Sequence, residues 1–232
     1  MGAAVITLRE GFEASLVVGI VLAFLARVER AEAYRVVWAG AAAAVAVSVV
    51  VGAGLFAVGA ELEGRAEAAF EGAVMLAAAG LLTWMIFWMR RQARSLRPEL
   101  EAKVEAALAA GSSLALGLVV FVAVVREGIE TALFLIGSVA SPASAVGGLL
   151  GLAGSVALGV LFFKGAARLD LRRFFTVTSV LLLLFAAWLL ANGLHELEEA
   201  SLLPESEPLL VAAFVGLAGP ALALYLRRPS AA

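Results

Sequence analysis

Seven apolar stretches divide the sequence, and each is long enough to cross a lipid bilayer as a helix. A membrane-spanning helix needs about 17 to 25 consecutive, mainly apolar residues. Runs of this length lie at about 4–26, 36–59, 69–89, 113–138, 146–166, 174–193 and 208–226. They are continuously apolar and lack the period-two alternation of a membrane β-barrel. The sequence therefore predicts an all-α integral membrane protein with seven transmembrane helices in a lipid bilayer.

The basic residues are distributed unevenly between the loops, and this distribution predicts an orientation. Of the 17 Lys and Arg residues, 14 lie in the first, third and fifth loops and the C-terminal tail, whereas the even-numbered loops hold only Arg65. Loops rich in Lys and Arg stay on the cytoplasmic side. We therefore expect the N-terminus outside and the C-terminus in the cytoplasm. No basic residue precedes Arg9, so we expect the first span to be retained rather than cleaved as a signal peptide.

The only long polar segment, about 90–112, separates two halves of the chain. Leu100, Val104 and Leu108 recur there at four-residue spacing, which predicts a short amphipathic helix on the cytoplasmic surface. A plain connector is the favoured interpretation of this segment, and a regulatory element is the alternative.

The two halves are expected to be inverted repeats within a single transmembrane domain, 1–232. Repeat one covers about 1–89 and repeat two about 113–193, and an extra C-terminal span follows at about 208–226. Each repeat has three spans, an odd number, so the second repeat must cross the membrane in the opposite direction from the first. Secondary transporters commonly have this arrangement, with their sites near the midplane at the repeat interface.

One five-residue pattern, Arg-Glu-Gly-x-Glu, occurs twice inside the predicted spans, at Arg9–Glu13 and Arg126–Glu130. An ionisable group at the centre of a spanning helix costs on the order of 2.5 to 3.5 kcal/mol, so six such groups indicate a functional site. The alternative is a pair of structural Arg–Glu bridges between helices. Two occurrences 117 residues apart, each with a surplus Glu, favour function.

The two motifs predict one shared cation site. In each motif the Arg and the second Glu are four residues apart and can pair, which leaves the first Glu uncompensated. The chain has no Cys and one His, so a bound metal must be held by oxygen atoms and at most one imidazole. Crowded carboxylates repel one another, so we expect some of them to carry protons when the site is empty. The candidate metal ligands are Glu10, Glu13, Glu127 and Glu130. Arg9 and Arg126 are expected to orient these ligands without binding the metal themselves.

Residues beside the motif carboxylates allow two interpretations each. Gly11 and Gly128 indicate either a close helix approach or a local break that frees backbone carbonyls. The hydroxyls of Ser15 and Thr131 are candidate ligands, but helix packing is the favoured role.

Acidic residues gather in the segments expected on the outer face, where they would concentrate cations. The alternative is an ordinary solvated surface. Glu71, His195 and Glu196 are the better candidates for an entrance, because they lie at the ends of spans where a pathway would open. No basic patch suits nucleic acid, so none is expected as a partner.

The doubled motif and its flanking segments resemble the iron permease family (iron/lead transporters), which includes the fungal oxidase-coupled permease and the bacterial ferrous-iron uptake permease. The segments that carry the resemblance are REGFE, REGIE, FEG at Phe70–Gly72 followed by LLTWMIFWM, and GLHELEE at Gly193–Glu199. The resemblance implies that the motif carboxylates bind iron during permeation. It also implies a multi-pass protein of the plasma membrane, the bacterial inner membrane, which receives iron from an extracytoplasmic iron-oxidising or iron-delivering protein. Trp84 and Trp88 are expected to pack rather than to bind metal.

The leading functional hypothesis is import of iron, Fe²⁺ or Fe³⁺, as a substrate, with no permanently bound cofactor. Oxygen ligands alone leave another divalent metal, such as manganese or lead, as the close alternative. An intramembrane acid–base enzyme using the paired Glu residues is disfavoured, because the chain lacks a zinc-binding HExxH motif and a Ser–His dyad. A purely structural subunit of a larger complex is the third alternative.

Overall fold

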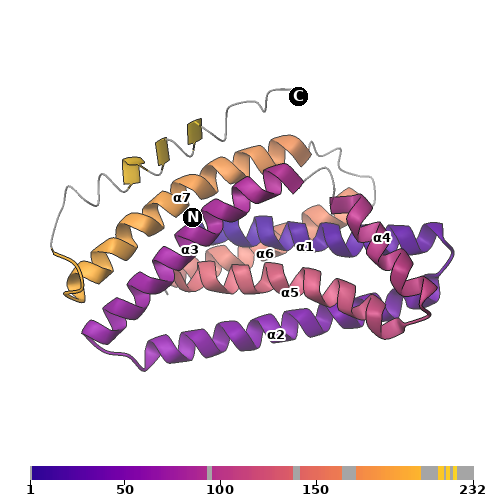
Figure 1. Cartoon of the computed structure of the whole chain (residues 1–232), viewed down its shortest axis with the longest axis horizontal. Helices are drawn as coiled ribbons and strands as arrows, with labels where there is room; N and C mark the ends of the chain where they lie inside the picture. Colours follow the sequence, from indigo (N-terminus) through magenta and orange to yellow (C-terminus); the bar gives the residue numbers. More distant parts are fainter. Residues whose placement is uncertain are drawn as a thin grey trace.

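The computed structural model describes residues 2–92, 96–137, 142–163 and 171–204, with short pieces between 214 and 223. All regular secondary structure in these residues is helical (Figure 1). The elements are α1 (Gly2–Arg27), a short 3₁₀ helix η1 (Ala31–Ala33), α2 (Tyr34–Ala60), α3 (Arg65–Gln92), α4 (Leu96–Ala109), α5 (Ser113–Gly137), α6 (Pro142–Phe163) and α7 (Leu171–Glu199).

Each of the first six expected spans corresponds to one long helix. Within the part of the chain that the structure describes, four segments are long and apolar enough to cross a membrane by length and composition: Ala31–Ala60, Arg65–Met89, Ala145–Phe163 and Arg173–Glu199. Helices α1 and α5 have comparable lengths, 26 and 25 residues, and each contains the three charged residues of one motif. The expected seventh span, 208–226, falls almost entirely outside the described residues.

The long helices pack in pairs that join distant parts of the sequence. Helix α1 lies against α6, α2 against α5, and α3 against α7, while α1 and α5 also touch each other (Figure 1). Small residues permit close approaches between these helices: a Cβ atom on Gly40 of α2 would lie 2.5 Å from the carbonyl oxygen of Gly117 on α5. The pairing brings the two motif helices side by side in the interior.

Two apolar clusters hold the helices together. One joins α3 and α7 and includes Ile6 of α1 and Phe134 of α5. The other joins α1, α2, α4 and α5. Helix α4, within the expected connector, contributes Leu100 and Val104 to this second cluster. Gly111 follows it with φ 63°, in the left-handed region that favours glycine.

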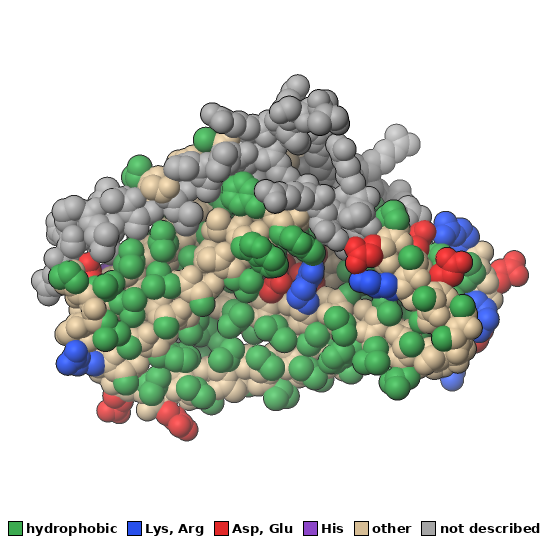
Figure 2. All heavy atoms as spheres, in the orientation of Figure 1, with side chains coloured by type: hydrophobic (Ala, Val, Ile, Leu, Met, Phe, Trp, Pro, Cys, Tyr) green, Lys and Arg blue, Asp and Glu red, His purple; other side chains and the backbone are tan. Residues whose placement is uncertain are grey.

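Apolar side chains cover much of the described outer surface. Large hydrophobic residues of α2 and α6 are especially exposed, including Val50 at 70% and Leu149 at 68%. In the space-filling view, hydrophobic side chains are spread over much of the visible face, with charged side chains gathered toward the two ends and in one group near the middle (Figure 2). Such a surface belongs in lipid rather than in water.

Candidate metal site

Both motifs lie inside the helix bundle, where α1 faces α5. In the first motif, Arg9, Glu10 and Glu13 are 1%, 0% and 5% exposed. In the second, Glu127 and Glu130 are 3% and 7% exposed. Ionised groups are buried at this level only when they are paired, when they bind a cation, or when they take up protons. The two motif helices therefore create an interior charged centre in an otherwise apolar bundle.

Three carboxylates from the two motifs converge at this centre. Glu10 of α1 and the pair Glu127 and Glu130 of α5 each offer one oxygen, and these oxygens all lie within 4.8 Å of one another. Carboxylate oxygens bind cations at about 2.0 to 2.6 Å, so two ligands of one ion lie at most about 4 to 5 Å apart. The spacing is that of ligands around a single ion, and we call these three residues the carboxylate triad.

Several oxygens of the carboxylate triad have no hydrogen-bond partner among the described residues. They are both oxygens of Glu10 and the Oε2 atoms of Glu127 and Glu130. Buried polar atoms are almost always satisfied in folded proteins, so a group of unsatisfied acceptors requires an explanation. A bound cation or protons would satisfy all of them.

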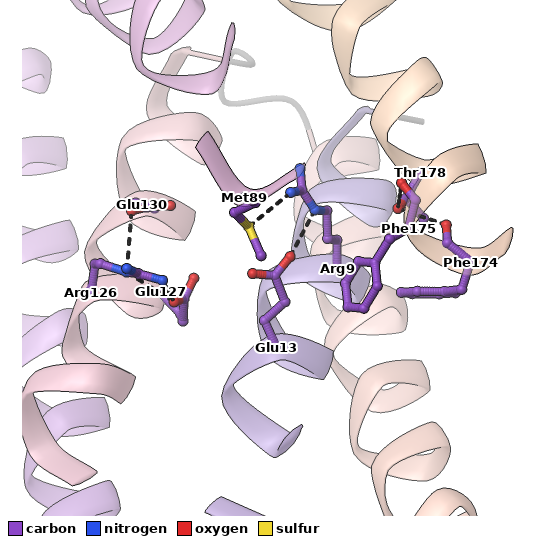
Figure 3. A network of polar contacts seen from close by, with 9 residues as sticks. All are labelled: Arg9, Glu13, Met89, Arg126, Glu127, Glu130, Phe174, Phe175 and Thr178. Carbon is purple, nitrogen blue, oxygen red and sulfur yellow. Dashed lines mark hydrogen bonds and ion pairs between the residues drawn. The ribbon is translucent and has the colours of Figure 1, made fainter. Parts of the chain in front are cut away.

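The fourth expected ligand, Glu13, lies outside the carboxylate triad because Arg9 holds it. Arg9 Nε donates to Glu13 Oε1 at 2.9 Å, which is the pair expected from the four-residue spacing. A second nitrogen, Nη2, donates to the sulfur of Met89 on α3 at 3.2 Å (Figure 3). Glu13 still lies close enough to interact electrostatically with Glu127 and Glu130.

The second arginine is arranged differently. Arg126 donates to Oε1 of the adjacent Glu127 through Nε at 3.1 Å and Nη2 at 2.5 Å. The pair with Glu130, four residues away, is looser at 3.8 Å (Figure 3). The side chain of Arg126 is 44% exposed, and its Cζ atom lies 5.2 Å from the ring centroid of Trp88 on α3. Two guanidiniums and four carboxylates thus leave the centre with net negative charge.

Helix α3 contributes two residues to the centre that the motif pattern alone does not predict. Met89 contacts the first arginine, and Trp88, expected only to pack, stacks against the second. Neither residue is ionisable, so the search for charged groups inside spans does not find them. Their shared position at the end of LLTWMIFWM, a segment that carries the family resemblance, is the one signal in the sequence.

The motif glycines provide close contacts between helices. A Cβ atom on Gly11 would lie 2.3 Å from Ser155 Oγ on α6, and one on Gly128 would lie 2.1 Å from Ser48 Oγ on α2. Both positions are within regular helix, so the structure has the close approach rather than the local break.

The two hydroxyl candidates donate hydrogen bonds within their own helices. Ser15 Oγ donates to the Gly11 carbonyl at 2.8 Å, and Thr131 Oγ1 donates to the Glu127 carbonyl at 2.7 Å. These bonds fit the packing role favoured from the sequence.

The expected entrance residues gather where α3 begins and α7 ends. Glu196 interacts electrostatically with Glu71 and with His195. His195 lies 3.3 Å from Glu199 and 3.6 Å from Glu198. This end of the α3–α7 pair is strongly acidic and attracts cations.

Comparison with known proteins identifies the family. The model of the iron permease FTR1 family matches residues 1–210. Ferrous iron permease EfeU of Escherichia coli O6:H1 (strain CFT073) is 38% identical over 202 residues, which cover 85% of this chain and 73% of that protein. EfeU of Yersinia pestis is 33% identical over 202 residues, 85% of this chain and 72% of that protein. An uncharacterized protein of Archaeoglobus fulgidus is 40% identical over 201 residues, 86% of this chain and 70% of its own length.

No solved structure matches the chain significantly. The family and its named members are permeases, that is, transport proteins rather than enzymes. The family model covers most of the sequence and both motifs, and the described helices are apolar enough for a multi-pass membrane protein. The chain is therefore a member of the iron permease FTR1 family.

Proposed function

We propose that this protein imports iron from the extracytoplasmic side into the cytoplasm, and that the ion passes through the carboxylate triad. The observation that carries the proposal is the convergence of Glu10, Glu127 and Glu130, with unpartnered oxygens, inside an apolar helix bundle. A structural Arg–Glu bridge accounts for Arg9 and Glu13 but not for Glu10, which has no partner among the described residues. A transported cation gives Glu10 a role.

The choice of ion rests on the relatives. Three hard oxygen ligands suit Fe²⁺, Fe³⁺ and Mn²⁺ alike, so the ligand chemistry does not select one of them. The relatives from Escherichia coli and Yersinia pestis are named ferrous iron permeases, which favours Fe²⁺ as the substrate here. Another divalent metal, such as manganese or lead, is the alternative that competition experiments address.

The proposed topology has seven spans, with the N-terminus outside, in the bacterial inner membrane. The loop charges support this orientation through the positive-inside rule. The inverted repeat is supported by contacts that exchange partners between the halves. Gly11 meets Ser155 and Gly128 meets Ser48, so each motif helix packs on the second helix of the other half.

A second pair of contacts follows the same exchange. A Cβ atom on Gly159 of α6 would lie 2.8 Å from Ser15 Cβ on α1, and one on Gly52 of α2 would lie 3.3 Å from Ala132 Cβ on α5. Position 15 is four residues after Gly11, and position 132 is four residues after Gly128. Two such exchanged pairs favour a pseudo-twofold axis between the motifs.

The proposed path begins at the acidic end of α3 and α7, near Glu71, His195 and Glu196. Carboxylates at a mouth raise the local cation concentration and the rate of capture. An extracytoplasmic iron-oxidising or iron-delivering protein would deposit iron at this end. The ion then moves to the carboxylate triad, where the three oxygens replace part of its hydration shell.

The test is radio-iron uptake into proteoliposomes under anaerobic conditions. Wild type is expected to take up Fe²⁺, whereas Glu127→Gln and Glu130→Gln should reduce uptake at least about tenfold, since each removes a charged ligand. Manganese, zinc and lead added as competitors rank the ions. Reconstituted protein is quantified in each preparation as the control. Equal uptake by wild type and both variants would rule out the proposed site.

A further inference from the structure

The guanidinium of Arg126 lies against two of the three carboxylates of the carboxylate triad. It donates two hydrogen bonds to Glu127 Oε1 and lies 3.8 Å from Glu130 Oε1. Two members of the triad are therefore already facing a cation that belongs to the protein. Glu10 has no hydrogen-bond partner among the described residues, and it interacts with Arg9 only electrostatically.

Arg9, at the matching position of the first motif, cannot serve in this way. Its side chain is 1% exposed and is held between Glu13 and the sulfur of Met89. Glu13 is not a member of the carboxylate triad. Arg9 therefore hydrogen-bonds a carboxylate beside the site, whereas Arg126 hydrogen-bonds a carboxylate of the site itself.

Arg126 also has a contact with another helix that it can keep when a metal ion takes its place at the carboxylates. Its side chain is 44% exposed, and it lies over the ring of Trp88. Trp88 in turn stacks on Trp84 with ring centroids 5.9 Å apart, and Trp84 is 60% exposed. A guanidinium gains cation–π attraction over the face of a Trp ring, most strongly where water is scarce. The two rings offer a surface beside the triad that holds the arginine without a carboxylate.

We propose that Arg126 is a tethered counter-cation, which balances the carboxylate triad between transport events, and which gives up these carboxylates to the incoming metal ion while it keeps its contact with Trp88. This inference rests on the proposed function. An interior cluster of unpaired carboxylates is costly, and the arginine lowers that cost while the site is empty. The same competition weakens metal binding, and a permeation site must bind weakly enough to release its ion.

Substitutions of Arg126 and of Trp88 should change the affinity for the metal ion in opposite directions. Without Arg126 the metal ion no longer competes with a cation, so binding becomes tighter. Trp88 is the partner that Arg126 keeps once the metal ion has taken the carboxylates, so without this ring the metal-bound state loses more than the empty state and metal binding becomes weaker. In the absence of Arg126, the Trp88 substitution should have no further effect. A purely structural role of these residues does not produce opposite signs in the single variants together with a double variant that matches Arg126→Gln alone.

The experiment measures Fe²⁺ binding to purified protein in lipid nanodiscs by anaerobic equilibrium dialysis with radio-iron, alongside uptake into proteoliposomes. Arg126→Gln is expected to bind Fe²⁺ about tenfold more tightly, a change of about 1.4 kcal/mol, and to turn over more slowly at saturating iron. Arg126→Lys keeps the charge and should bind close to wild type. Trp88→Leu should bind more weakly, Trp88→Phe should resemble wild type, and the double variant Arg126→Gln/Trp88→Leu should match Arg126→Gln.

Arg9→Gln is the matched control: Arg9 donates its hydrogen bonds to Glu13 and Met89 and acts on the carboxylate triad only electrostatically, so its loss should tighten binding much less than Arg126→Gln does. The inference is overturned if Arg126→Gln binds Fe²⁺ with unchanged or weaker affinity. If Arg126→Gln gives too little folded protein, Trp88→Leu against Trp88→Phe decides: equal affinities overturn it. Loss of binding in Glu127→Gln together with unchanged affinity in Arg126→Gln would reject the counter-cation and leave the proposed site standing. Unchanged binding in both would reject both.

Discussion

The two copies of the motif carry the same charged residues but hold them in different surroundings. In the first copy the arginine is buried and donates hydrogen bonds to Glu13 and Met89. In the second copy the arginine is 44% exposed, turns to the adjacent Glu127, and rests against Trp88. One sequence pattern therefore gives one fixed ion pair and one accessible cation.

The difference arises from the neighbouring helices rather than from the motifs. Helix α3 presents Trp88 to one arginine and Met89 to the other, because adjacent residues of a helix point in different directions. The two motifs have the same charged residues, but they contact different side chains of α3. The comparison teaches that the motif supplies charges, whereas α3 assigns the role of each arginine.

Loss of stability should separate the two arginines most strongly. Arg9→Met leaves the buried Glu13 without its partner and should lower the free energy of unfolding by about 3 to 5 kcal/mol. Arg126→Met should cost less, because the side chain is partly exposed, and Fe²⁺ should recover the loss by binding the folded state. Denaturant or thermal unfolding in detergent, with and without anaerobic Fe²⁺, measures both. Equal losses that ignore the metal would show that the two arginines have the same role.

Substitution of the two motif glycines tests a feature that the two copies share, which is close packing against a serine of a facing helix. Gly11→Ala and Gly128→Ala each push a Cβ atom against a serine of the facing helix and should each cost about 1 to 3 kcal/mol by overpacking. Ser155→Gly should rescue the first and Ser48→Gly the second, because each serine hydroxyl donates its hydrogen bond to a carbonyl of its own helix. Thermal unfolding of the four single and two double variants measures the effect. A large cost at only one glycine, or rescue by the wrong serine, would count against the exchanged packing.

Loss of the contact between Met89 and Arg9 should have the smallest effect on stability. This effect should be confined to the surroundings of the first motif. Met89→Leu keeps the volume of the side chain but removes the sulfur acceptor of Arg9 Nη2, so a loss of about 1 kcal/mol is expected. Fe²⁺ affinity should stay within a factor of about 2, less than 0.5 kcal/mol, because Arg9 lies outside the carboxylate triad. A Met89→Leu protein that binds iron much more weakly would instead make the sulfur a part of the site.

Much of the helical framework could be predicted from hydrophobicity alone. The expected span 36–59 is helix Tyr34–Ala60, and 113–138 is helix Ser113–Gly137. Apolar runs bounded by charged loops fix these limits, because the backbone of a lipid-embedded segment must satisfy its own hydrogen bonds. The extra span at 208–226 lies outside this comparison, since the structure describes little of it.

The candidate site could be predicted in part. Helical spacing predicts the ion pair of Arg9 with Glu13, and it forms at 2.9 Å. The same spacing favours Arg126 with Glu130, yet that pair is the looser one at 3.8 Å. Periodicity describes one helix at a time, whereas the position of Arg126 depends on Trp88 of another helix. Which carboxylates converge likewise depends on how the helices pack together. The separation of Glu13 from the carboxylate triad could therefore not be predicted from the sequence.

The most direct test of a single shared site is the number of iron ions bound per chain, measured anaerobically in purified wild type, Glu10→Gln and Glu127→Gln. Because the carboxylate triad draws on both motifs, wild type should bind one Fe²⁺, and each variant should lose that ion although the other motif is intact. Glu13→Gln, where it folds, should retain it. Two ions in wild type, one lost in each variant, would contradict the shared site and make the motifs independent.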